Sequence, residues 1–81
     1  ETLESPFTIY PNPAKETLFL RTDSEFYTEY VITDLLGKNY SQGIIISNTT
    51  SINTSALSSG SYMIKVYNKD GSTAFKTFII K

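Results

Sequence analysis

Short runs of alternating apolar and polar residues recur along the chain, and turn residues separate them. The clearest run is Ser61–Asn68, in which Tyr62, Ile64 and Val66 point to one side. Alternation with a period of two residues is typical of a strand with one buried face. The same pattern predicts further strands at Phe7–Tyr10, Thr17–Thr22, Tyr27–Asp34, Asn39–Ile46, Thr50–Ser55 and Thr73–Lys81.

The last of these runs is ambiguous, because both of its faces carry apolar side chains. Phe75 and Ile79 would share one face, while Phe78 and Ile80 would share the other. Either both faces are buried there, or one apolar pair is exposed near the end of the strand.

Proline, glycine and asparagine mark the boundaries between the runs. Pro11 and Pro13 end the first strand, because proline fixes φ and removes a backbone donor, and Asn12 between them is pushed toward an extended conformation. The stretch Leu35–Lys38 predicts a tight turn in which Gly37 has a positive φ. Further turns are predicted at Asp23–Glu25 and Lys69–Gly71, and a bulge is predicted at Gly43. Ala56–Gly60 is predicted to be a loop, for which a single helical turn is an alternative.

About seven short strands, spaced by roughly 8–12 residues, predict an antiparallel β-sandwich of immunoglobulin-like size. The chain of 81 residues is long enough for one domain with a modest core. A single sheet would leave one apolar face in water, so two packed sheets are expected.

The composition excludes several classes of function. The net charge is -1, without a run of either sign, so neither a nucleic-acid partner nor polybasic membrane binding is expected. The chain has no histidine and no cysteine, which removes the usual general base and the main zinc ligands. We therefore expect no enzyme activity, no catalytic residues, and no cofactor, metal ion or small-molecule substrate.

The remaining polar and aromatic candidates have structural interpretations. Asp34 stands just before a turn, where a carboxylate usually accepts hydrogen bonds from backbone N–H groups. Asp70 and Asn68 are too few oxygen ligands to indicate calcium. Tyr40 and Tyr67 are candidates for stacking on a sugar, since alternation turns Tyr67 away from the face that carries Tyr62.

Several short motifs then follow one another in order. The chain reads "YPNPA", "YVITDLLGK", "INTSALSSGSYMIKV", a glycine hairpin at Gly71, and "FKTFIIK". This order and spacing resembles the C-terminal sorting domain (type A) of proteins exported by the type IX, or Por, secretion system of Bacteroidetes. The resemblance covers Phe7 to Lys81. By position, the family motif falls on Tyr10, Pro11, Asn12, Pro13, Asp34, Gly37, Lys38, Leu57, Gly60 and Tyr62.

The resemblance implies a sorting signal rather than a catalyst. Such a domain is fused to the end of an N-terminal cargo protein, crosses the periplasm, and is recognised by the outer-membrane machinery. A sortase-like peptidase then removes it, and the cargo is secreted or attached to the cell surface. The chain opens "ETLESP" without an initiator Met, so residues 1–6 are expected to be a linker from a larger protein and residues 7–81 the sorting domain.

The last strand is the expected recognition surface, because an unpaired edge offers main-chain hydrogen bonds to a partner. The residues assigned to this surface are Lys76, Phe78, Ile80 and Lys81. A plain closing strand without a recognition role explains the same residues equally well. The alternative function is an accessory module of a secreted enzyme or adhesin that binds carbohydrate or protein.

Overall fold

The chain folds into seven strands and no helix within the part that the computed structural model describes, residues 7–22 and 27–81. The turn expected at Asp23–Glu25 lies outside these residues. The strands are β1 (Phe7–Tyr10), β2 (Thr17–Thr22), β3 (Tyr27–Asp34), β4 (Asn39–Ile44), β5 (Thr49–Asn53), β6 (Gly60–Asn68) and β7 (Thr73–Ile80). This part of the chain contains no helix that is long and apolar enough to cross a membrane.

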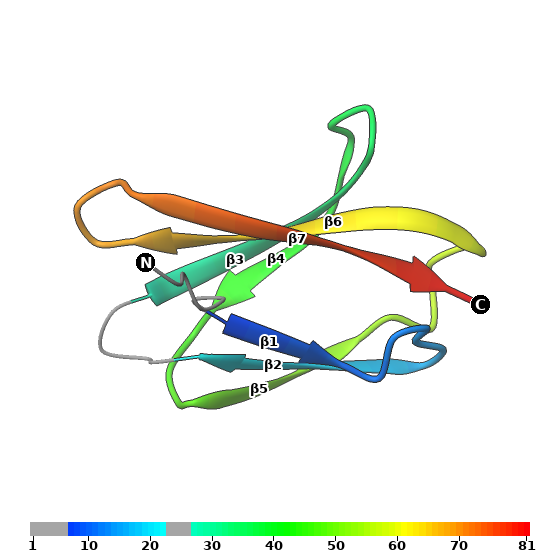
Figure 1. Ribbon diagram of the computed structural model, residues 1–81, viewed down its shortest axis with the longest axis horizontal. Coiled ribbons are helices and arrows are strands. Elements are labelled where there is room, and N and C mark those ends of the chain that lie inside the picture. Colours follow the sequence, from blue (N-terminus) through cyan, green and yellow to red (C-terminus); the bar gives the residue numbers. More distant parts are fainter. Residues whose placement is uncertain (1–6, 23–26) are drawn as a thin grey trace, which may run out of the picture.

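The strands form two sheets that lie one above the other (Figure 1). The order is β1-β2-β5 in the smaller sheet and β4-β3-β6-β7 in the larger one. All pairs of neighbouring strands are antiparallel. The predicted fold class, an antiparallel β-sandwich, is confirmed. Strands β1 and β7 each stand at the edge of a sheet.

The core lies between the sheets and is filled from the alternating positions that the sequence pattern selects. Leu18 and Leu20 of β2, with Ile32 of β3, are fully buried. Tyr62, Ile64 and Val66 of β6 are buried as well, as predicted. The other buried apolar residues are Phe7, Ala14, Tyr27, Tyr30, Ile45, Ile52, Phe78 and Ile80.

The ambiguity of the last strand is resolved by the packing of the two sheets. Phe78 and Ile80 are only 1% and 3% exposed and belong to the core, whereas Phe75 and Ile79 are 61% and 49% exposed. One face of β7 therefore packs against the smaller sheet, and the other presents an apolar pair to solvent.

The fourth strand departs from the prediction in two ways. It ends at Ile44 rather than Ile46, whose side chain is exposed. The irregularity in its pairing is at Tyr40, because Ile32 pairs with Ser41 while Thr33 pairs with Asn39. The bulge predicted at Gly43 was therefore placed three residues too late.

Gly43 has a packing role instead. It lies opposite Tyr30 in the register of β3 and β4, and the Tyr30 ring covers it. A Cβ atom at this position would come within 2.7 Å of the Tyr30 ring. Glycine is therefore needed here because an aromatic ring occupies the space of a side chain.

Candidate functional site

Three of the motif segments gather at the end of the sandwich opposite the Gly71 hairpin (Figure 1). The connection between β1 and β2, the loop that leads into β6, and the end of β7 lie together there (Figure 1). We call residues 11–16, which connect β1 to β2, the proline corner. Its position explains why segments at opposite ends of the sequence belong to one motif.

The proline corner docks on the edge of β7. The Ala14 N–H donates to the Ile79 carbonyl at 2.8 Å, and the Lys81 N–H donates to the Ala14 carbonyl at 2.9 Å. Ala14 and Ile80 thereby form a parallel bridge, and the Ala14 side chain is fully buried. The corner leaves the smaller sheet, pairs with the larger one, and returns to β2.

The asparagine between the prolines adds a third bond to the same edge. Its Oδ1 accepts the Ile79 N–H at 3.1 Å, which joins residues 67 positions apart. Pro11 and Pro13 have no N–H, so the first backbone donor after Asn12 is that of Ala14, which bonds the Ile79 carbonyl. The peptide bonds Tyr10–Pro11 and Asn12–Pro13 are both cis.

The two flanks of the proline corner are also held. On one side, the Tyr10 ring stacks on Phe19 of β2, with ring centroids 5.3 Å apart. On the other side, Thr54 donates its N–H to the Glu16 carbonyl at 2.8 Å and its hydroxyl to the Lys15 carbonyl at 3.0 Å. Thr54 is a buried polar residue, so these bonds satisfy its polar groups inside the protein.

The Asp34–Lys38 turn has the structure that the sequence predicts. Asp34 Oδ1 accepts the Lys38 N–H and the Leu36 N–H, each at 2.9 Å. These bonds to the charged form hold the pKa of the Asp34 carboxyl below its ordinary value, the bond from Lys38 contributing most. Gly37 has φ of 96°, a conformation that favours glycine. Asp34 is therefore a turn-stabilising residue.

The segment Leu57–Tyr62 is fixed by its tyrosine. Tyr62 is buried, and its hydroxyl donates to the Ser58 carbonyl at 2.7 Å, which ties the loop to the start of β6. Leu57 packs against the core from the same loop. Gly60 has a positive φ and begins β6. The loop therefore enters the strand in one defined conformation.

A row of aromatic rings connects these motifs to the last strand. The Tyr62 ring stacks on Phe78 with centroids 5.9 Å apart, and the Tyr40 ring meets Tyr62 edge to face at 5.6 Å. Lys38 Nζ lies 5.3 Å from the centroid of the Tyr40 ring. The Asp34–Lys38 turn, the β6 loop and β7 are thus one packed unit.

The predicted recognition residues do not share one surface. Phe78 and Ile80 are in the core, so they cannot offer side chains to a partner while the domain is folded. Lys76 is half-buried, with its Nζ 5.8 Å from the centroid of the Phe7 ring, and Lys81 is exposed. The expectation of one exposed apolar-basic strand is corrected accordingly. The alternation pattern does not distinguish which face of β7 is buried, which is why it predicts Phe78 and Ile80 as recognition groups.

Other residues of the site escaped the sequence analysis. Ala14 looks like an ordinary residue after a proline, and Thr54 lies near the end of the predicted strand Thr50–Ser55. One sequence feature points to Ala14, which carries the first backbone N–H after the two prolines around Asn12. Leu35 and Asn12 also line, with the end of β7, a hollow of about 250 Å³.

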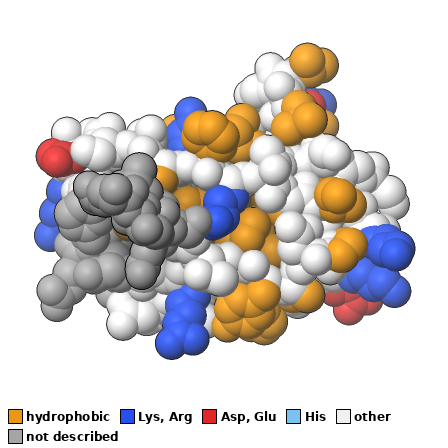
Figure 2. All heavy atoms as spheres, in the orientation of Figure 1, with side chains coloured by type: hydrophobic (Ala, Val, Ile, Leu, Met, Phe, Trp, Pro, Cys, Tyr) orange, Lys and Arg blue, Asp and Glu red, His pale blue; other side chains and the backbone are white. Residues whose placement is uncertain are grey.

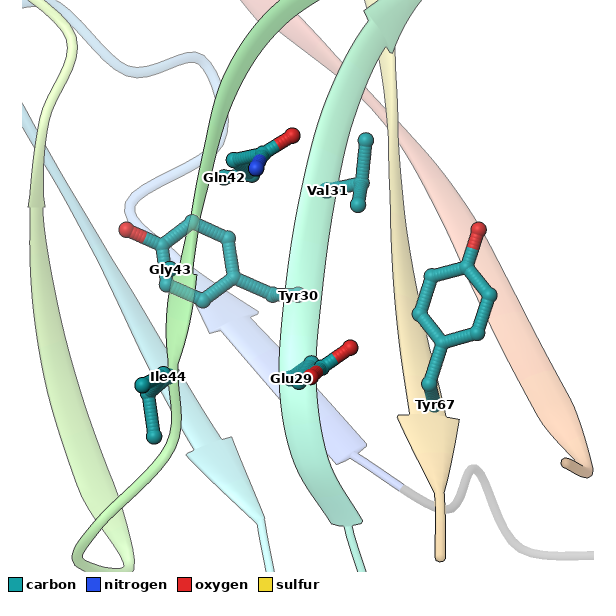
Figure 3. A pocket seen from close by; sticks show the side chains of 7 residues that line it. All are labelled: Glu29, Tyr30, Val31, Gln42, Gly43, Ile44 and Tyr67. Carbon is teal, nitrogen blue, oxygen red and sulfur yellow. The ribbon is translucent and has the colours of Figure 1, made fainter. Parts of the chain in front are cut away.

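The tyrosines considered for sugar binding do not form a common platform. Tyr67 lines a shallow hollow of about 400 Å³ on the outer face of β3, β4 and β6, together with Glu29 and Ile44 (Figure 3). Tyr40 instead contacts Tyr62, which pairs with Asp34 at the other end of β6. Among the described residues, no group of three His, Cys, Asp or Glu side chains could hold a metal ion.

The comparisons with known proteins agree with the motif pattern. Residues 8–81 match the family model described as the secretion system C-terminal sorting domain. No curated protein sequence matches the chain. The match covers β1 to β7 and includes the proline corner and the strand that receives it. The chain therefore belongs to the family of C-terminal sorting domains of the type IX secretion system, which carry proteins to the cell surface or into the medium.

Proposed function

We propose that the type IX machinery contacts this domain at the end of the sandwich where the proline corner meets β7. The docked corner is the observation that supports this proposal. The bonds of Asn12 and Ala14 to Ile79 and Lys81 build one surface from both ends of the domain. That surface exists only in the folded protein, so the machinery reads a shape rather than a linear peptide.

The predicted recognition residues divide into two roles under this proposal. Lys76 and Lys81 supply positive charge beside the proline corner. Phe78 and Ile80 act from inside the core by fixing the position of β7. Lys76 and Lys81 are therefore the side chains that a partner meets directly.

The remaining steps follow from the position of the domain in a longer protein. A cargo protein precedes the domain, and residues 1–6 are the linker between them. After passage through the periplasm, a sortase-like peptidase cuts the linker and the cargo is released or attached to the surface. The sequence "ETLESP" has the polar composition of a linker that a peptidase can cut.

A secretion reporter tests the proposal. Residues 1–81 are fused behind a periplasmic reporter in a host with the type IX machinery, and the reporter is measured in the medium and at the surface. The double variant Lys76→Ser/Lys81→Ser removes both charges. Lys69→Ser is the matched control, because Lys69 is an exposed lysine in the β6–β7 hairpin.

We expect the double variant to lower secretion at least about tenfold, while Lys69→Ser leaves it unchanged and thermal unfolding shows both proteins folded. Equal secretion of all three proteins would exclude the two lysines as recognition groups. Secretion of an unfolded variant such as Phe78→Asp would show that the machinery reads a linear peptide.

A further inference from the structure

Within residues 7–22 and 27–81, the edge of β7 is paired at one end only. Ile79 turns its N–H and C=O away from β6, toward Asn12 and Ala14. Backbone groups alternate in direction along an antiparallel strand, so the N–H and C=O of Phe75 and Thr77 point to the same side. No residue of the described ranges donates to or accepts from these groups. Within the described residues, the N–H and C=O groups of Phe75 and Thr77 are therefore available to pair with a further strand.

Strand β1 runs beside this edge without pairing to it. Among the described residues, the backbone bridge between this edge and the segment that follows β1 is at Ala14 and Ile80. Between the strands lies a hollow of about 320 Å³ lined by Thr8, Ile9, Asn12, Lys76 and Thr77. The hollow leaves room beside β7 for another extended backbone, which needs a spacing of about 4.8 Å.

The charge beside the open edge is positive. The sequence from Gly71 to Lys81 contains two lysines and no acidic residue. Lys76 lines the hollow, and Lys65 lies opposite Phe75 on the neighbouring strand β6. On this side of the molecule, hydrophobic side chains lie in the middle with basic groups beside them, and acidic groups lie at the margins (Figure 2).

This charge argues against a second copy of the domain as the occupant. Two β7 edges that pair antiparallel through Phe75 and Thr77 would place the two Lys76 side chains directly opposite each other. Like charges in that position are destabilising. An acidic side chain there would instead pair with Lys76 beside the Phe7 ring.

We propose that an extended, acidic segment of another protein adds to the larger sheet as a fifth strand along Phe75–Thr77. Its backbone bonds the open N–H and C=O groups of β7, and an acidic side chain meets Lys76 in the hollow. This inference rests on the proposed function for the identity of the partner, which is a component of the secretion machinery. The proline corner limits the added strand at Ile79.

Peptide binding to the 81-residue chain tests the inference by NMR. The probe is a seven-residue capped peptide of alternating Thr and Glu, and the same peptide with Lys in place of Glu is its control. The acidic peptide is expected to slow hydrogen exchange at the Phe75 and Thr77 amides. The Lys76 amide, which already bonds β6, is expected to change little.

Matched variants identify the bonds. Thr77→Pro removes only the outward N–H, which an edge strand tolerates, whereas Thr77→Val keeps it. We expect about tenfold weaker binding for Thr77→Pro than for Thr77→Val, as the loss of one hydrogen bond implies. Lys76→Glu should reverse the preference between the two peptides. If Thr77→Pro does not fold, the exchange rates of the unmodified domain decide the question.

Three results would overturn the inference. They are the absence of peptide effects at Phe75 and Thr77, equal binding of both peptides, and dimerisation that Thr77→Pro abolishes, which would identify a second copy as the occupant. The secretion reporter separates this inference from the proposed function. If Thr77→Pro and Thr77→Val are secreted equally while Lys76→Ser/Lys81→Ser is not, only the added strand is wrong.

Discussion

At the scale of single residues, the side chain of Asn12 is the most informative one to change. Asn12→Ala removes the acceptor of the Ile79 N–H, while Asn12→Asp keeps an acceptor oxygen. We expect Asn12→Ala to lower the free energy of unfolding by about 0.5–1.5 kcal/mol, the net value of one hydrogen bond. Urea unfolding measures the change, and hydrogen exchange should become faster at Ile79.

Asn12→Asp should remain near the wild type in both measurements, since its carboxylate accepts the same N–H. If both variants lose the same stability, the Asn12 side chain is not what holds the proline corner to β7.

The lowered pKa of Asp34 predicts that the free energy of unfolding depends on pH. Its pKa is lowered from the ordinary value of 3.8 in the folded protein. The ionised carboxylate therefore stabilises the fold above the unfolded-state pKa, and this contribution is lost as the pH falls through the folded-state pKa. Asp34→Asn cannot titrate, so its stability should fall less than that of the wild type between about pH 5 and pH 2.

Urea unfolding at a series of pH values checks this expectation. Asp70, whose pKa is also lowered through bonds from Ser72, should give the same sign when changed to Asn. If the free energy of unfolding changes with pH in the same way for Asp34→Asn and the wild type, the Asp34 carboxylate does not stabilise the turn.

At the scale of elements, β7 has two faces with different roles. Phe78→Ala removes a core ring that stacks on Tyr62, and we expect a loss of about 3–5 kcal/mol. Domains of this kind have a total stability of about 5–15 kcal/mol, so the variant is close to unfolding. Phe75→Ala changes an exposed ring and should cost far less. Thermal unfolding of both variants compares the two faces of β7. Equal losses of stability would contradict the assignment of Phe78 to the core and of Phe75 to the surface.

The elements themselves could be predicted because their pattern is local. Alternation in segments such as Ser61–Asn68 defines a strand without reference to any other part of the chain. The turn at Gly37 and the acceptor role of Asp34 were predictable for the same reason. The faces of β7 were not, since Phe75 and Phe78 are equally apolar and only the packed sheets distinguish them.

The site was less predictable than the strands. The motif order named Asn12 and Pro13, but it could not show that they dock on a strand 67 positions away. The hydrogen bonds of Ala14 involve backbone groups, which every residue except proline carries, so the sequence does not identify their partners on β7. The bulge at Tyr40 was misplaced because glycine is the usual marker of a bulge, whereas Gly43 instead makes room for Tyr30.

At the scale of the whole molecule, charge and exposed apolar surface together predict a minimum of solubility. The isoelectric point is about 5.2, so the net charge is close to zero near that pH. Exposed apolar side chains such as Ile44, Phe75 and Ile79 then meet little electrostatic repulsion. We expect light scattering to rise most near pH 5, and Phe75→Thr to reduce it. Thr77→Ser on the same face is the control, and an equal effect of both variants would contradict this explanation.

The contact between Ala14 and the last residues of β7 has a consequence for synthesis. The ribosome adds the β7 residues that bond the proline corner only some sixty residues after the corner itself. A chain that stops before Ile79, through a nonsense codon or a broken message, leaves the corner without its partner. Under the proposed function, the domain therefore also reports that translation has passed β7, and proteins that end before Ile79 are expected to be withheld from the cell surface.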